Sequence, residues 1–245
     1  MVINELLVLA QDAALESGRI LLKEGGSSID SESGHDIKLR ADKESESRIF
    51  AKLEQTGINI LSEEYGVNKK NDDDLWWIVD PLDGSLNYQR HISICCISIA
   101  LWKEGKPLLG VVYDFNNDKL YSGIVGEGAS LNGKSICVSG ISEKGKAIIA
   151  TGFPVYLKFD DKVLSDFVKT LQDYKKVRLF GSAALSCMMV AQGSVEVYSE
   201  SNIALWDVAA GIAIIESAGG NCIYEYTDKE KYLLNVFAAN GRINK

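Results

Sequence analysis

The chain has 245 residues, 46% apolar and 24% charged, which is the composition of an ordinary globular protein. Its 26 basic and 34 acidic residues give a net charge of −8, which argues against a surface for nucleic acid or anionic membranes. It contains no run of about 18 uncharged apolar residues, and residues 1–25 lack the pattern of a signal peptide. We therefore expect a cytoplasmic protein, in which a bound cation would have to attract any anionic substrate.

The cysteines indicate reduced, buried thiols rather than a disulfide framework or a zinc site. Their number is odd, most lie in apolar runs, no pair has the spacing of zinc ligands, and the two histidines are isolated. The five are Cys95, Cys96, Cys137, Cys187 and Cys222.

The first half of the chain is expected to contain two helices followed by mostly antiparallel strands. Apolar spacing predicts a helix over 3–24 and another over 42–55, separated by a polar loop at 27–36. Short apolar runs bounded by turn residues predict strands at 58–61, 75–79, 92–102, 107–113 and 118–125. An irregular, glycine-punctuated stretch is expected after residue 125.

The second half alternates between strands and helices, which predicts an α/β layer. The expected strands are 147–151, 176–180, 195–198 and 222–226, and the expected helices are 161–173, 183–192 and 206–218. We expect an N-terminal α+β half over 1–140, which carries most metal ligands, and a C-terminal α/β half over 141–245. The two halves would form one compact unit with the functional site between them.

Carboxylates fall at the ends of predicted strands and the starts of predicted helices, where they can converge at one edge of a sheet. They are Asp42, Glu63, Glu64, Asp80, Asp83 and Asp207. Three segments carry most of these carboxylates: the pair 63–64, DPLDGS at 80–85 and WDVAAG at 206–211. Each alone has an ordinary structural explanation, as a solvated acidic pair, a turn cap and a helix cap respectively. It is the order of the three segments along the chain that favours a shared site.

The segment Asp80-Pro81-Leu82-Asp83-Gly84-Ser85 suits a metal and phosphate site. We expect Pro81 to turn the chain sharply after the strand, so that Asp80 and Asp83 point at one centre and the Leu82 carbonyl is free to coordinate. The amides after Gly84 would open a helix and could hold a phosphate. Oxygen-only ligands suit Mg²⁺, and two such ions would polarise a phosphate and activate a water.

These motifs resemble the inositol monophosphatase family of Mg²⁺-dependent, lithium-sensitive phosphatases. The resemblance spans nearly the whole chain: LSEE at 61–64, WWIVDPLDGSLNY at 76–88, KPLLGVVYDF at 106–115, GSAAL at 181–185 and ALWDVAAGIAIIESAGG at 204–220. It implies an α/β (α+β) fold, a layered αβαβα sandwich of the inositol monophosphatase and fructose-1,6-bisphosphatase type. It also implies a homodimer that hydrolyses small phosphomonoesters with metal-activated water.

The resemblance also assigns metal ligands. Glu63, Asp80 and the Leu82 carbonyl look like ligands of a first, activating Mg²⁺. Asp80, Asp83 and Asp207 look like ligands of a second Mg²⁺ that stabilises the leaving oxygen, and a third, weaker ion could sit on Glu63. Asp83 is expected to be the least replaceable residue: its change to Asn should reduce the rate by roughly 10³-fold and alter fold stability little.

The remaining assignments concern water and substrate. Ser85, in place of the family's threonine, would orient the attacking water with Asp42. The amides of Gly84 and Ser85 would hold the phosphate, and Glu200 would contact substrate hydroxyls. Ser182 and Ala183 would line the substrate side of the site.

The leading interpretation is a phosphatase for inositol monophosphate or a related sugar phosphate, because DGSLNY and Glu200 match the inositol-type branch. A 3′(2′),5′-bisphosphate nucleotidase is less favoured, since its Lys-Glu-Phe after DGT is absent. A fructose-1,6-bisphosphatase would need a basic pocket, which Lys38 and Arg40 could supply; both depart from the family pattern. A regulatory, protein-binding member is the non-enzyme alternative, although every metal carboxylate is present.

Overall fold

The computed structural model describes residues 2–25, 29–33, 36–153 and 161–245, with only the backbone described for 29–33, 36–42 and 161. The helices are α1 (Ile3–Glu24), α2 (Arg40–Leu53), α3 (Ser85–Gln89), α4 (Asp161–Gln172), α5 (Ala183–Ala191) and α6 (Leu205–Ser217). The strands are β1 (Ile29–Ser33), β2 (Asp36–Leu39), β3 (Asn59–Ser62), β4 (Gly66–Asn68), β5 (Leu75–Asp83), β6 (Cys96–Lys103), β7 (Lys106–Asp114), β8 (Lys119–Ile124), β9 (Gly128–Leu131), β10 (Lys134–Ile136), β11 (Ile148–Ala150), β12 (Lys176–Arg178), β13 (Val197–Ala204), β14 (Asn221–Asp228) and β15 (Leu233–Ala239).

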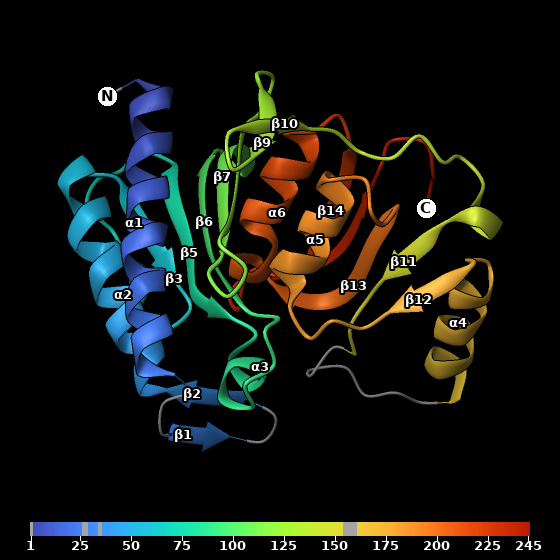
Figure 1. The fold of residues 1–245 in the computed structure, drawn as a ribbon, viewed down its shortest axis with the longest axis horizontal. Helices are drawn as coiled ribbons and strands as arrows, with labels where there is room; N and C mark the ends of the chain where they lie inside the picture. The colour runs from blue at the N-terminus through green and yellow to red at the C-terminus, as the bar shows by residue number, and fades with distance from the viewer. Residues whose placement is uncertain (1, 26–28, 34–35, 154–160) are drawn as a thin grey trace.

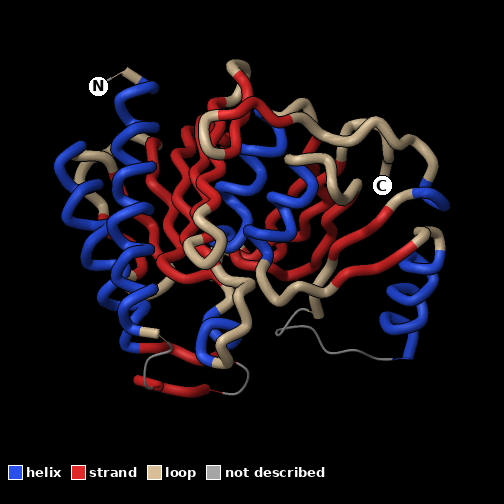
Figure 2. Tube along the Cα trace, in the orientation of Figure 1, coloured by secondary structure: helices blue, strands red, loops and turns tan. Residues whose placement is uncertain are grey.

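Helices and sheets alternate in five layers. The larger sheet has the order β10-β9-β8-β7-β6-β5-β3-β4, and the smaller has the order β12-β11-β13-β15-β14. Helices α1 and α2 cover the outer face of the larger sheet, α5 and α6 lie between the sheets, and α4 lies beyond the smaller sheet (Figure 1). The predicted αβαβα sandwich is therefore confirmed, and Figure 2 shows the same layers by type of structure.

The layers follow from which faces of the helices are apolar. On α1 the buried apolar residues recur at three- and four-residue intervals, as in Leu6, Ala10, Ala13 and Ala14, so one face packs on the sheet. Helix α6 is buried over the whole run 208–215, as expected for a helix enclosed between two sheets. The packing of α6 on β7 is close: a side chain at Gly110 would place its Cβ 2.4 Å from the carbonyl oxygen of Ala210.

Strand pairing places two carboxylates side by side. Strands β3 and β5 are parallel, with Ser62 opposite Val79, so their carboxyl ends meet at one edge of the sheet. Glu63 follows β3 directly, and Asp80 lies at the corresponding level of β5. The bond from the Glu63 N–H to the Val79 carbonyl, 3.2 Å, extends the pairing up to Glu63.

The predicted sharp turn at Pro81 is wrong. Strand β5 continues through Pro81 to Asp83, with its register shifting between Asp80 and Asp83. Asp80 pairs with Ser98 and Asp83 with Cys96, so β5 holds one extra residue there. A bulge of this kind tolerates a proline, which has no N–H for the ladder, and it re-aims the side chains that follow.

Other differences from the sequence prediction concern short or late elements. The predicted loop at 27–36 contains strand β1 and the start of β2, which pair in an antiparallel manner, and the predicted irregular stretch after residue 125 contains β9 and β10. Strand β15 was missed although it pairs with both β13 and β14.

Cys137 is exposed, whereas Cys95, Cys96 and Cys187 are buried free thiols. The boundary at 140 stays a prediction.

Within the described ranges, we find no helix that combines the length and the apolar character needed to cross a membrane.

Candidate metal centre and substrate pocket

A pocket of about 250 Å³ lies where the bulged end of β5 meets the starts of α5 and α6. Of the predicted site residues, those that line it are Glu63, Asp80, Leu82, Asp83, Gly84, Ser85, Ser182, Ala183, Glu200 and Asp207. The side chain of Asp42 lies outside the described part of the structure, so its predicted role stays a prediction. The fold thus brings segments separated by more than a hundred residues to one cavity.

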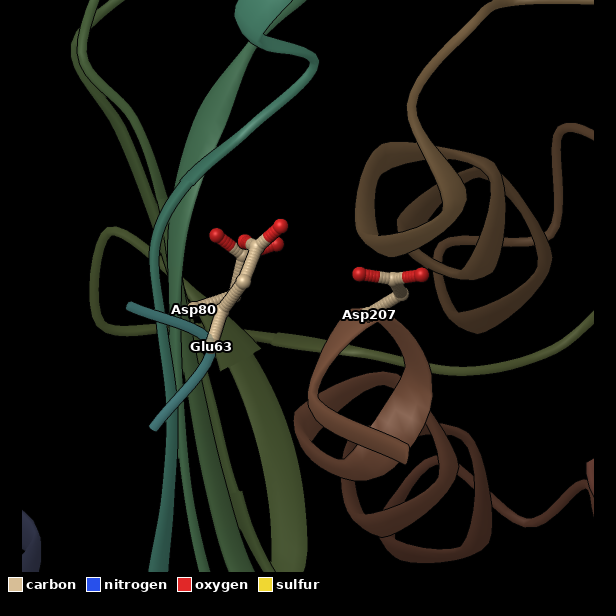
Figure 3. Close-up of side chains that lie close together, drawn as sticks. All are labelled: Glu63, Asp80 and Asp207. Carbon is tan, nitrogen blue, oxygen red and sulfur yellow. The ribbon is translucent and has the colours of Figure 1, made fainter. Parts of the chain in front are cut away.

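Three carboxylates form the acidic centre of this pocket. Glu63, Asp80 and Asp207 each offer one oxygen, and the three oxygens lie within 4.8 Å of one another. Figure 3 shows Glu63 and Asp80 projecting from the side of the larger sheet toward Asp207, which faces them from the start of α6. Asp80 is the most enclosed, with 1% of its surface exposed.

The electrostatics of the three carboxylates favour a bound cation. Burial raises the pKa of Asp80 well above its ordinary value, and the negative charges of Glu63 and Asp83 raise it further. The pKa of Asp207 is raised in the same way, first by burial and then by Glu63. Carboxylate oxygens are the preferred ligands of hard divalent cations, which would offset this repulsion. The residues present therefore fit a metal such as Mg²⁺.

The raised pKa values predict how the stability of the metal-free protein depends on pH. The folded protein retains protons on Asp80 and Asp207 at pH values where the unfolded chain has released them, so the free energy of unfolding falls as pH rises through this window. In EDTA we expect Tm to fall as the pH rises above about 4, the ordinary pKa of an aspartate, and to fall less steeply in Asp80→Asn. Differential scanning calorimetry at several pH values measures how steeply Tm falls in the wild type and in Asp80→Asn. Equal slopes would contradict a raised pKa of Asp80.

Asp83 points to the start of α5. Its carboxylate accepts hydrogen bonds from the backbone N–H groups of Ala184, at 2.9 Å, and Ala183, at 3.3 Å, and from the Ser182 hydroxyl. The Cys96 thiol is a further donor, at 3.6 Å. Burial raises the pKa of Asp83, whereas these donors lower it. The structure therefore shows Asp83 as a cap of α5, and metal binding by Asp83 stays a prediction.

The turn from β5 into α3 depends on Gly84. Its φ of 85° is in the left-handed region, and a Cβ there would lie 2.8 Å from the Ile94 carbonyl oxygen. The Ser85 hydroxyl donates a 2.9 Å hydrogen bond to the Leu82 carbonyl, which was predicted as a metal ligand. The Ser85 oxygen keeps its acceptor capacity, so its predicted contact with water is compatible with this bond.

Glu200 lies in β13, a strand of the smaller sheet, and lines the same pocket. It accepts a 2.9 Å hydrogen bond from the Tyr198 hydroxyl, and its carboxylate lies so close to Gly152 that a Cβ there would approach within 2.4 Å. Burial raises the pKa of Glu200 to about 7, and the nearby Asp83 adds to the rise. Glu200 thus combines a carboxylate with a fixed orientation inside the pocket.

Sequence reasoning missed part of the wall. The additional lining residues are Thr151, Gly152, Phe153, Gly181, Ser186 and Ile203. Thr151 and Gly152 directly follow the short strand β11. Their position at the end of a predicted strand was the signal that could have indicated them, as it did for the carboxylates. None of the six is a titratable residue.

The fold is an alternating sandwich of helices and sheets, and carboxylates from a sheet layer and from a helix layer meet at one pocket. These features define a class of proteins suited to hold a divalent cation beside a small ligand. A sequence profile of the inositol monophosphatase family matches residues 3–242. The chain therefore belongs to the inositol monophosphatase family.

Individual relatives agree with this assignment. The chain is 33% identical to an inositol-1-monophosphatase of Mesorhizobium japonicum over 224 residues, 89% of this chain and 84% of the relative. It is 30% identical to the Nus factor SuhB of Pasteurella multocida over 254 residues, 99% of this chain and 94% of the relative. The solved structure of inositol monophosphatase from Anabaena superposes with a TM-score of 0.85 at 33% identity, covering 98% of this chain and 92% of that one.

Proposed function

We propose that the protein hydrolyses a small phosphomonoester, an inositol monophosphate or a related sugar phosphate, with Mg²⁺ bound in the pocket. The observation that carries the proposal is the group formed by Glu63, Asp80 and Asp207, whose oxygens lie within 4.8 Å of one another in a pocket that also holds Glu200. When bound, Mg²⁺ would polarise the phosphate and lower the pKa of a water. Two ions per site, lithium sensitivity and a homodimer remain predictions from the family resemblance, and a cytoplasmic location remains a prediction from the sequence.

The position of each residue in the pocket would determine whether it binds the metal, the phosphate or the water. Glu63, Asp80 and Asp207 would hold Mg²⁺, with the Leu82 carbonyl and Asp83 as the further ligands predicted from the sequence. Backbone amides of Gly84 and Ser85 would bind phosphate oxygens, and the Ser85 hydroxyl would orient water. These fixed dipoles need no rearrangement during the reaction, which is what makes such donors effective.

The part of the pocket wall that contains Glu200 suits a polyol. Glu200 is held by Tyr198, and a carboxylate can accept hydrogen bonds from two neighbouring hydroxyls. Among the residues that the structure describes, the pocket lining includes no lysine or arginine. This composition favours a monophosphate over the two bisphosphate alternatives, which need a cation for the second phosphate; the side chains of Lys38 and Arg40 are not described.

Phosphate release tests this proposal. Purified protein is incubated with inositol, sugar and nucleotide monophosphates, each with Mg²⁺ and each with EDTA. We expect turnover with Mg²⁺, highest on a polyol phosphate, no turnover in EDTA, and inhibition by Li⁺. Absence of turnover on every compound with Mg²⁺ would overturn the proposal and leave the protein-binding alternative, which the similarity to a Nus factor supports.

Glu200 gives a prediction about specificity. In Glu200→Ala, we expect KM for polyol phosphates to rise while kcat changes less, because Glu200 contacts the alcohol part and not the reacting phosphate. The ranking of inositol against sugar phosphates should change as well. Steady-state kinetics on a matched substrate set measure both effects, with Tyr198→Phe as a milder variant that removes only the hydrogen bond to Glu200. An unchanged ranking would show a purely structural role.

A further inference from the structure

A further buried carboxylate, that of Glu46, lies outside the pocket and holds the segment that presents Glu63. Glu46 lies on α2 and only 8% of its surface is exposed. One of its carboxylate oxygens accepts hydrogen bonds from the Ser62 hydroxyl and from the backbone N–H of Tyr65, the latter at 2.9 Å. These two partners flank the acidic pair that contains Glu63. Glu46 therefore fixes the chain on both sides of a residue of the metal centre.

The preceding residue on α2 holds the other metal-binding strand. The Ser45 hydroxyl donates a 2.7 Å hydrogen bond to the carbonyl of Pro81, and both residues are buried. This bond fixes the backbone of the bulge directly before Leu82, a residue that lines the pocket. The Ser17 hydroxyl of α1 in turn contacts Ser45.

Two adjacent residues of one helix thus hold both strand ends that supply the metal centre. We propose that Ser45 and Glu46 are positioning residues of the metal centre: Glu46 sets the turn that presents Glu63, and Ser45 sets the bulge that presents Asp80 and the Leu82 carbonyl. Neither residue is among those that line the pocket. The inference rests on the proposed function only in that Glu63 and Asp80 bind Mg²⁺.

The physical reason is preorganisation. The oxygens of Glu63, Asp80 and Asp207 lie within 4.8 Å of one another, and like charges this close repel, so without restraint the strand ends would move apart. The hydrogen bonds from Ser45 and Glu46 hold the strand ends together before the cation binds. Removing a hydrogen-bonding partner that supports metal ligands typically lowers metal affinity by about 10- to 100-fold. The expected signature is weaker Mg²⁺ binding, beyond any loss of fold stability.

The experiment measures Mg²⁺ binding to the metal-free full chain by isothermal titration calorimetry, with Tm in EDTA as the stability readout. In Glu46→Ala we expect Kd for Mg²⁺ to rise about 10-fold or more. Glu46→Gln keeps an acceptor oxygen for Ser62 and Tyr65, so we expect it to restore most of the affinity. Ile49→Val, a core change on the same helix, is the matched control: it should lower Tm and leave Kd unchanged.

Ser62→Ala and Ser45→Ala keep the test decisive if Glu46→Ala does not fold. Each removes one hydrogen bond, and each should weaken Mg²⁺ binding by less than Glu46→Ala. When Glu46→Ala and Ser62→Ala are combined, the loss of Mg²⁺ affinity should be smaller than the sum of the losses in the two single variants, because the two residues share one hydrogen bond. Wild-type affinity in all folded variants, or no Mg²⁺ binding by wild type, overturns the inference. Mg²⁺ binding without phosphate release would overturn only the proposed function.

Discussion

Asp80→Asn is expected to reduce kcat/KM by at least about 10³-fold, equal to roughly 4 kcal/mol of transition-state stabilisation. Asp80 is the most enclosed of the three clustered carboxylates, and asparagine retains its volume and the acceptor for the Leu82 N–H, 2.9 Å away. The substitution therefore removes one negative charge and little else. Mg²⁺ would lose the ligand that both predicted metal positions share.

The same substitution should raise Tm in EDTA, because burial and the neighbouring charges disfavour ionised Asp80 in the metal-free protein. Phosphate release at saturating Mg²⁺ and calorimetry in EDTA measure the two effects. Asp73→Asn is the matched control, since Asp73 is an exposed aspartate on the approach to the same strand. If Asp80→Asn turns over within about tenfold of wild type, Asp80 is not a ligand of the reacting metal.

Asp83→Asn is expected to lose activity by roughly 10³-fold and also to lose about 1–3 kcal/mol of stability. The second expectation differs from the one drawn from sequence, because the structure shows the carboxylate as the acceptor of two backbone N–H groups of α5. An asparagine side chain offers only one acceptor oxygen, and its amide would face these fixed donors. The Ser182 hydroxyl can rotate to adapt, whereas the backbone groups cannot.

A second variant separates capping from metal binding. Ser182→Ala removes the hydroxyl that donates to Asp83 and caps Leu185, but leaves the carboxylate in place. Both variants should lower Tm, and only Asp83→Asn should abolish Mg²⁺-dependent turnover. Equal turnover in the two variants would show that Asp83 acts only as the cap of α5.

Sequence alone determined the parts of this protein that depend on local pattern. The apolar spacing of residues 3–24 predicted a helix that begins and ends where α1 does. The order LSEE, DPLDGS and ALWDVAAG identified Glu63, Asp80 and Asp207 before their proximity was known. Periodicity and motif order suffice here, since each is set by residues near one another in the chain.

The tertiary structure decided how the segments meet. Strand β15 pairs with two strands that precede it in the sequence, and its apolar run alone did not identify it. Pro81 continues a bulged strand because β6 pairs on both sides of it, which no local turn preference reveals. Asp83 faces α5 although a hundred residues separate them, and Glu46 lies behind Glu63 because α2 packs on β5, the strand next to β3. Hydrogen-bond partners of buried carboxylates come from whatever the fold places beside them, and for these residues that is chain far away in sequence.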